Sequence, residues 1–281
     1  MVAGSKSLHL LSAVNNDPSF FTGTHLSVLI DRSEVAWAVT ERRSGKVVEV
    51  GSYMRSVELS ADDAKLRDEA LHQRRYGSGS IAFRGNATLI IPKAGFQADQ
   101  RQAWLRYGLG HEVAHPLQDD LRELDAVVLT VVSDDDRRLA DSIPAGKLVS
   151  NAGLYIGAML RHSQKVKQPV GYVDIANGFF DLYLRDERGF LLHNTFEAST
   201  PEDVIYHTAN AVQQLKLDLE RLQVRLSGDI GVESETYKLY RSYFGDVSIH
   251  FGFGMPLVDL PLSSLRKQEY MSLLNQYACV S

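Results

Sequence analysis

The chain has 281 residues, of which 44% are apolar and 23% charged, a size and composition that suit a globular protein of one large or two medium domains. The apolar content argues against intrinsic disorder. The formal net charge is -5 and no basic block interrupts the sequence, so affinity for the phosphate backbone of a nucleic acid has no visible source. We therefore expect no nucleic-acid partner.

The first 20 residues do not resemble a secretory signal. The short apolar run at 8–14 is interrupted by His9 and Ser12, and no small-residue cleavage pattern follows. No window approaches 18 consecutive apolar residues, so we expect no membrane-spanning helix. The single cysteine, Cys279, cannot form an internal disulfide, which suits a reducing compartment. The sequence predicts a soluble, cytoplasmic protein.

The first half of the chain begins with a meander. Residues 26–54 alternate apolar and polar positions, with a turn at 43–46, which predicts three antiparallel strands. Ser60 precedes Asp62 and Asp63, which is typical of a helix start, and this helix should reach about Gln73. The pattern then predicts a flexible connection at 77–80, a buried strand at 87–92, a helix at 97–107, a central strand at 126–132, a short strand at 147–150 and a helix at 151–162.

The second half opens with another meander, at about 172–192. Thr200 and Pro201 then supply a capping residue and a proline at the first helical position, which predicts a helix from 201 to about 217. After it we expect a strand at 222–226, a loop at 227–229, a helix at 233–244, a strand at 246–250 and a closing helix at 263–277.

The two meanders are copies of one pattern. In each, an apolar strand ending in Asp, at 28–31 or 172–174, is followed by a turn, an alternating strand, a turn with Gly and a third strand. Such an internal repeat predicts two similar halves with a cleft between them, each a mixed sheet with helices on both faces. We place the first half at residues 1–166, with a peripheral segment at 1–23, and the second at 167–281.

The order of strands and helices, which is repeated in the two halves, resembles that of the superfamily of actin, sugar kinases and Hsp70. The stretches that carry the resemblance are 88–93, Asp174, Phe180, 194–196, 201–206, 214–217 and 226–230. They look like the signature of the domain of unknown function 3822, an uncharacterised family found mainly in Bacteroidetes. The resemblance implies an α/β protein with two ribonuclease-H-like lobes in an actin-like ATPase fold, each lobe a mixed five-stranded sheet flanked by helices. It implies a fold and not an activity.

The resemblance also implies where a nucleotide would bind. In active members, a turn with Gly after each strand Asp cradles phosphate, while the Asp holds hydrated magnesium. The first loop here, residues 31–34, keeps Asp31 and Ser33 but lacks the Gly and has Glu34 instead. An uncompensated carboxylate about 4 Å from a phosphate oxygen would cost roughly 4 kcal/mol at an effective dielectric near 20.

The other two loops also depart from the pattern. Asp174 is placed correctly, but Asn177 and Gly178 are better explained as a two-residue hairpin turn. The segment that would contact adenosine needs a pair of glycines, and this chain offers one. For both Asp31 and Asp174, hydrogen bonding to turn amides is the simpler interpretation. The candidate residues of the cleft are Asp31, Ser33, Asp174, Asn177, Gly178, Ser227, Gly228 and Asp229.

A second motif competes with this interpretation. Residues 111–115 read HExxH, which on a helix would place His111 and His115 on one face for zinc, with Glu112 beside the metal-bound water. The context disfavours it, because Gly110 precedes the motif and Pro116 follows it. A third ligand has no obvious candidate. We therefore expect no metal site here.

Three functional hypotheses follow. The leading one is a binding or scaffold module with a degenerate nucleotide site, without catalytic residues or a required cofactor, acting on an unknown protein partner. The alternative is a divergent ATPase or phosphotransferase that binds ATP and magnesium weakly in the cleft. The remote alternative is a zinc hydrolase at His111 and His115.

Overall fold

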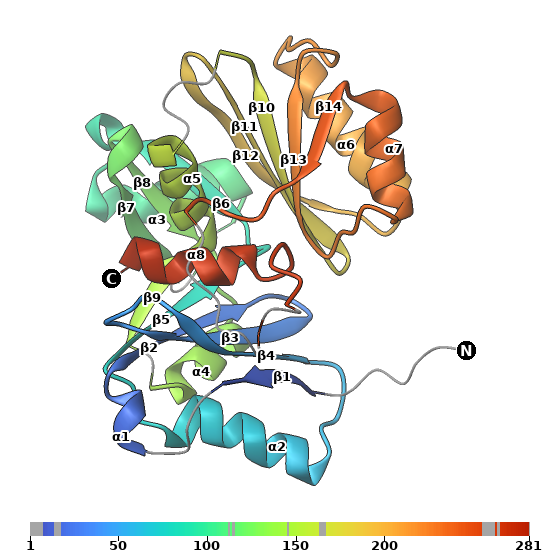
Figure 1. The fold of residues 1–281 in the computed structure, drawn as a ribbon. Helices are drawn as coiled ribbons and strands as arrows, with labels where there is room; N and C mark the ends of the chain where they lie inside the picture. Colours follow the sequence, from blue (N-terminus) through green and yellow to red (C-terminus); the bar gives the residue numbers. More distant parts are fainter. Residues whose placement is uncertain are drawn as a thin grey trace.

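A computed structural model describes residues 8–13, 18–111, 113, 116–144, 146–162, 167–254, 262 and 265–280. Within these residues the chain forms three sheets (Figure 1). No helix in the described part combines the length and the apolarity that crossing a membrane requires.

The first sheet has six strands and contains the first meander. Its order is β1-β4-β3-β2-β5-β9. The pairs β2-β5 and β5-β9 are parallel, and the other neighbouring pairs are antiparallel. The bounds are β1 Leu8–Ser12, β2 Thr24–Ile30, β3 Glu34–Glu41, β4 Val47–Met54, β5 Ser78–Phe83 and β9 Lys147–Ser150. The mixed sheet expected from the sequence is thus confirmed, with β1 as an additional edge strand.

The second sheet has the five strands expected, in the order β12-β11-β10-β13-β14. The three antiparallel strands of the meander are followed by two that run parallel to β10. The bounds are β10 Val170–Ala176, β11 Phe179–Asp186, β12 Gly189–Glu197, β13 Gln223–Gly228 and β14 Asp246–Ile249. This sheet and the first share the strand pattern that the repeat predicts.

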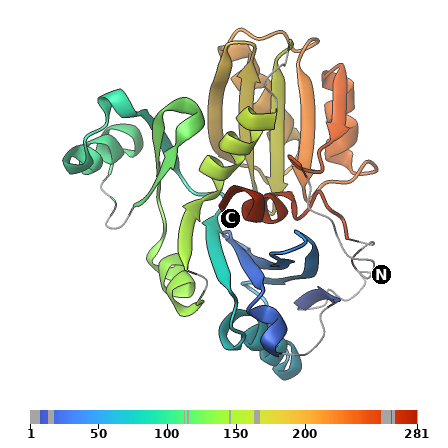
Figure 2. The same ribbon diagram turned by 60° about the vertical axis from the view of Figure 1, so that its left-hand side comes forward.

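A third, smaller sheet is inserted between β5 and β9. It consists of β6 (Thr88–Pro92), β7 (Leu117–Leu121) and β8 (Ala126–Thr130), with β8 in the centre. Figure 2 shows it projecting to one side together with α3 (Arg101–Leu109). The prediction that the strand at 126–132 is central and covered is confirmed, because every residue of β8 is buried.

Helices cover the sheets where the caps predicted them. Ser60 and Thr200 each accept a hydrogen bond from the third residue of the helix, and Asp203 completes a capping box with Thr200. The remaining bounds are α1 Pro18–Phe21, α2 Ala61–Asp68 with a π-helical extension Glu69–Gln73, α4 Asp134–Ser142, α5 Asn151–His162, α6 Pro201–Gln214, α7 Glu235–Tyr243 and α8 Met271–Val280, with short 3-10 turns at Lys93–Gly95, Ala98–Gln100 and Arg122–Leu124.

The last helix, α8, lies between the two large sheets in both views (Figures 1 and 2). It contacts β2, β3 and β5 of the first sheet and β13 of the second. Leu273 and Leu274 pack against Leu29 and Ala82 in one apolar cluster. The boundary at 166/167 stays a prediction, and this helix from the second half lies against the sheet of the first.

The closing helix expected from residue 263 begins only at Met271. Two other sequence interpretations were wrong. Residues 78–80 do not form a flexible connection but begin β5, because pairing with β2 supplies their backbone partners and His25 bonds the hydroxyls of Ser78 and Ser80. Ser227 and Gly228 do not form a loop but end β13 and are buried. In both places tertiary pairing outweighs a local composition that is typical of turns.

Candidate functional site

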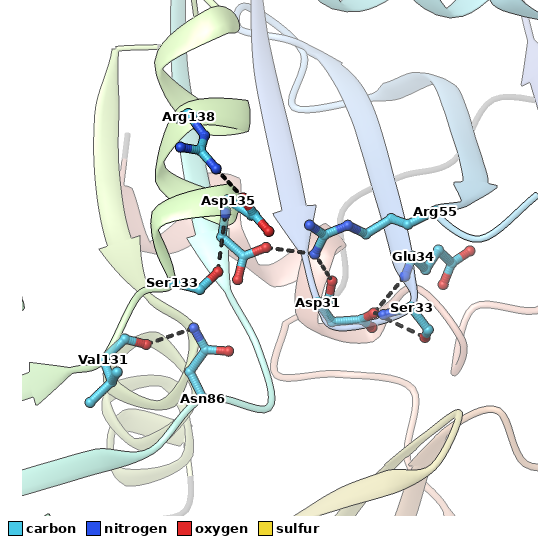
Figure 3. A network of polar contacts seen from close by, with 10 residues as sticks. Asp31, Ser33, Glu34, Arg55, Asn86, Val131, Ser133, Asp135 and Arg138 are labelled. Atoms are coloured by element: carbon cyan, nitrogen blue, oxygen red, sulfur yellow. Dashed lines mark hydrogen bonds and ion pairs between the residues drawn. The ribbon is translucent and has the colours of Figure 1, made fainter.

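Asp31 follows the last residue of β2, and its carboxylate organises the turn into β3. Oδ1 accepts hydrogen bonds from the backbone N-H groups of Ser33 (2.8 Å) and Glu34 (2.7 Å), as Figure 3 shows. The Arg55 side chain donates to the Asp31 carbonyl and also pairs with Asp136. The expected role of Asp31 in bonding turn amides is therefore present in the structure.

Asp174 lies on β10, in the equivalent position of the second lobe, and is 1% exposed. Its carboxylate accepts hydrogen bonds from the hydroxyls of Ser227 on β13 (3.0 Å) and Ser272 on α8 (2.9 Å). Burial raises the pKa of Asp174, against the opposing effect of the Arg84 charge. The prediction that Asp174 bonds turn amides was wrong, because in the described part of the chain its hydrogen bonds come from the side chains of Ser227, Ser272 and Arg84, which the fold brings around this buried carboxylate.

Arg84, one residue after β5, joins the two aspartates. Its Nη2 lies 2.8 Å from Asp31 Oδ2 and its Nη1 lies 3.4 Å from Asp174 Oδ2, with 6% of the side chain exposed. Burial acts to lower the pKa of Arg84, but Asp174 and Asp31 raise it above its ordinary value. Burial likewise acts to raise the pKa of Asp31, and the Arg84 charge and the turn amides hold it below its usual range.

The backbone beside Arg84 is fitted closely to the second lobe. Gly85 has a φ of +73°, and a Cβ on it would lie 2.5 Å from the Phe179 ring. The guanidinium carbons of Arg84 and Arg32 lie 5.7 and 5.5 Å from the centre of that ring. Arg32 also forms an exposed ion pair with Glu197, 3.0 Å long. The guanidinium groups of two first-lobe arginines thus both lie against the ring of Phe179, the first residue of β11.

A cleft of about 240 Å³ opens above the ion pair. Four of the eight predicted site residues line it: Asp31, Ser33, Asn177 and Asp229. Asp174 lies buried below it, and Gly178, Ser227 and Gly228 are outside its lining. The sequence interpretation missed the lining residues Met54, Arg84, Glu269 and Tyr270. Arg84 follows β5, whose Gly and Ser residues are typical of a loop, so no local pattern indicated this arginine.

The lining of the cleft is acidic. Glu34, Asp229 and Glu269 all contribute carboxylates, and Glu269 pairs with Arg266. Burial raises the pKa of Glu34, and the charges of Asp31 and Asp229 add to the rise. Burial also raises the pKa of Glu269, with further contributions from Asp229 and Glu34. An arriving phosphate would meet these three carboxylates, and the one arginine of the lining, Arg84, is already paired with Asp31 and Asp174.

The raised pKa of Glu34 predicts a pH effect on stability. The folded state binds this proton more tightly than the unfolded state, whose Glu pKa is about 4.3, so the carboxyl stabilises the fold below that pH and loses this contribution as pH rises through the folded pKa. Glu34→Gln should therefore be more stable than the wild type at pH 8, and the difference should shrink toward pH 4. Urea unfolding at both pH values measures it, with the exposed Glu233→Gln as control. An equal stability difference at both pH values would contradict the prediction.

The turn at Asn177 and Gly178 confirms the hairpin prediction. It joins β10 to β11, and Gly178 has a φ of +83° with no atom within 4 Å of an added Cβ. Gly228 has the same φ, but a Cβ on it would lie 1.9 Å from the Ile175 carbonyl oxygen. Its small size is required by the approach of β13 to β10.

The HExxH string lies beyond α3. That helix ends at Leu109, and Gly110 caps it with a φ of +80°. His111 is exposed, and its ring nitrogen Nδ1 lies 3.1 Å from the Leu109 carbonyl oxygen. Glu112 and His115 lie outside the described residues. Among the residues that the structure describes, no group of three or more His, Cys, Asp and Glu side chains could hold a metal ion.

A profile of the proteins of unknown function grouped as DUF3822 matches residues 16–247. The chain belongs to this family. No curated protein matches it in sequence. The family membership that the motifs of both halves indicated is therefore confirmed.

Solved structures with the same fold include one from Bacteroides thetaiotaomicron, a protein with an actin-like ATPase fold and unknown function. It is 16% identical, with a TM-score of 0.72 over 84% of this chain and 94% of that one. The PilM-PilN type IV pilus biogenesis complex is 12% identical, with a TM-score of 0.53 over 89% and 95%. The Clostridium difficile activator of 2-hydroxyisocaproyl-CoA dehydratase, which holds ADPNP, is 6% identical, with a TM-score of 0.44 over 90% and 92%. This DUF3822 protein has the actin-like ATPase fold.

Proposed function

We propose that this DUF3822 protein is a non-catalytic binding module whose nucleotide site is replaced by an internal ion pair. The observation that carries the proposal is the position of Arg84, whose guanidinium bridges Asp31 and Asp174. In an active relative of this fold, a hydrated magnesium ion would face these aspartates. Here an arginine, which stays protonated in proteins, supplies the positive charge from within the chain.

The surroundings of Arg84 support the same proposal. Asp174 is buried and already accepts hydrogen bonds from Ser227 and Ser272, so a metal-bound water would have to compete with these hydroxyls. The carboxylates of Glu34, Asp229 and Glu269 line the space where the phosphates of a nucleotide would enter. The negative charges of these carboxylates would repel the phosphates and so oppose nucleotide binding.

A module without catalysis acts through what it binds. The PilM-PilN structure shows a protein of this fold in a complex with another protein. We propose by analogy a protein partner for this chain, in the cytoplasm and without a required cofactor. We also propose the division into lobes at 1–166 and 167–281.

Calorimetry with ATP and magnesium, together with a phosphate-release assay, tests the loss of the nucleotide site. We expect no binding tighter than about 1 mM, which corresponds to about 4 kcal/mol, and no hydrolysis. The same titration of Asp174→Asn decides the alternative. Micromolar, magnesium-dependent binding with turnover in the wild type, lost in Asp174→Asn, would establish a divergent ATPase instead.

A further inference from the structure

A second hollow lies at the end of the first sheet opposite Asp31, and its lining is cationic whereas that of the inter-lobe cleft is acidic. It has a volume of about 670 Å³ and lies where the parallel strands β2, β5 and β9 begin, whereas Asp31 follows the end of β2. Among the described residues, its lining contains Arg42, Arg43, Lys147 and His25 and no acidic side chain. The chain as a whole carries a net charge of -5, so a hollow lined by three cationic side chains has the opposite sign of charge.

The two arginines form no ion pair in the described part of the chain, whereas Lys147 lies close enough to Asp119 for its charge to oppose the raised pKa of that carboxyl. None of the ion pairs within 4 Å there includes Arg42, Arg43 or Lys147. The neighbouring carboxylate of Glu41 accepts a hydrogen bond from Ser44 and does not line the hollow. Asp119 therefore offsets part of the Lys147 charge, and the positive charge of Arg42 and Arg43 faces the hollow without an ion-pair partner among the described residues.

The backbone that carries the arginines is fixed before any ligand arrives. The Arg42 N-H donates to the Gly23 carbonyl (3.0 Å), and the Arg42 carbonyl accepts from the Tyr277 hydroxyl of α8 (3.2 Å). An added Cβ on Gly77 would lie 3.3 Å from Arg42 Nη1, which places that guanidinium beside the start of β5. A preformed wall lowers the entropic cost of binding.

The floor of the hollow is neutral and aromatic. His25 is 2% exposed, and its two ring nitrogens bond the hydroxyls of Ser78 (2.9 Å) and Ser80 (3.0 Å). Burial first, and then the Arg42 charge, lower the pKa of His25 to about 4, so the ring is uncharged at neutral pH. The Tyr277 ring lies 5.3 Å from it, centre to centre. Such a floor suits the organic part of a small ligand.

We propose that this hollow binds a small phosphate-bearing molecule, with Arg42, Arg43 and Lys147 around the phosphate and the organic part over His25 and Tyr277. Arginine forks match phosphate oxygens in geometry, and the lysine adds a point charge. The volume lies within the range of ligand pockets in proteins. This site is separate from the inter-lobe cleft and does not depend on whether the cleft binds nucleotide.

Calorimetric titration of the full chain with pyrophosphate, at low and at physiological salt, tests the site. We expect saturable one-to-one binding that weakens as salt rises. Arg42→Ala combined with Arg43→Ala should lose about tenfold or more in affinity, because two hydrogen-bonded charge contacts disappear. The matched control is Arg137→Ala combined with Arg138→Ala, which removes two exposed adjacent arginines of α4.

Two additional variants test whether binding depends on the arginine geometry and on this hollow. Arg42→Lys with Arg43→Lys should retain part of the affinity, since it keeps the charge and loses the fork geometry. Asp174→Asn, which alters the buried ion pair below the inter-lobe cleft, should bind pyrophosphate as the wild type does. The proposal is overturned if the wild type gives no saturable binding, if the double alanine variant binds within about twofold of it, or if Asp174→Asn abolishes the signal.

Discussion

Replacing Arg84 with Met should lower the free energy of unfolding by about 3 to 5 kcal/mol, the usual consequence of removing one partner from a buried ion pair. Asp31 and Asp174 are 3% and 1% exposed, so their charges would remain in the interior without a cation. Met keeps most of the side-chain volume, so the loss reports charge rather than packing. Urea unfolding followed by circular dichroism measures it.

The control for this substitution is Arg137→Met, at a side chain that is 43% exposed and pairs with Asp141 within α4. Its effect should stay within about 0.5 kcal/mol. A second comparison identifies the cause: Arg84→Met combined with Asp31→Asn and Asp174→Asn should recover much of the lost stability, because no unpaired charge remains. A loss below about 1 kcal/mol for Arg84→Met alone would show that water reaches these aspartates and that the bridge does not hold the lobes together.

Gly228→Ala should cost about 3 kcal/mol, whereas Gly178→Ala should cost about 1 kcal/mol. Both glycines have a φ of +83°, so the backbone strain of an L residue is the same in both. Only Gly228 lies against another strand, with the Ile175 carbonyl oxygen 1.9 Å from the added Cβ. The difference between the variants therefore measures the approach of β13 to β10.

Thermal and urea unfolding of both glycine variants provide the measurement. Equal losses would mean that the φ angle alone requires glycine at 228, and that β13 can move away from β10 at little cost. That result would also reopen the interpretation of Gly228 as a residue kept for a ligand. A larger loss at 228 assigns it to the packing of the second sheet.

Local patterns predicted much of the second lobe. Period-two alternation predicted its meander, and the Asn177 and Gly178 pair its hairpin turn. Thr200 and Pro201 predicted the start of α6 at the residue where it begins. These signals succeed because caps and tight turns are satisfied by neighbours within a few residues.

Other features depend on partners far away in the sequence. The Gly and Ser composition of 77–80 is typical of a loop, and β5 forms there because β2 offers backbone partners and His25 bonds its hydroxyls. β1 was not predicted as a strand, since only the edge of β4 supplies its partners. The sequence predicted strands at 87–92 and 126–132 without indicating that they belong to a separate sheet.

The sequence by itself determined the duplication, the family and the two strand-end aspartates, because repeats, caps and turns depend on residues that are close in the sequence. Only the tertiary structure decided what those aspartates do. Arg84 lies 53 residues after Asp31 and 90 before Asp174, and no local pattern joins the three. A buried charge must find its counter-ion wherever the fold places one, so the ion pair at the centre of this protein is a property of its packing.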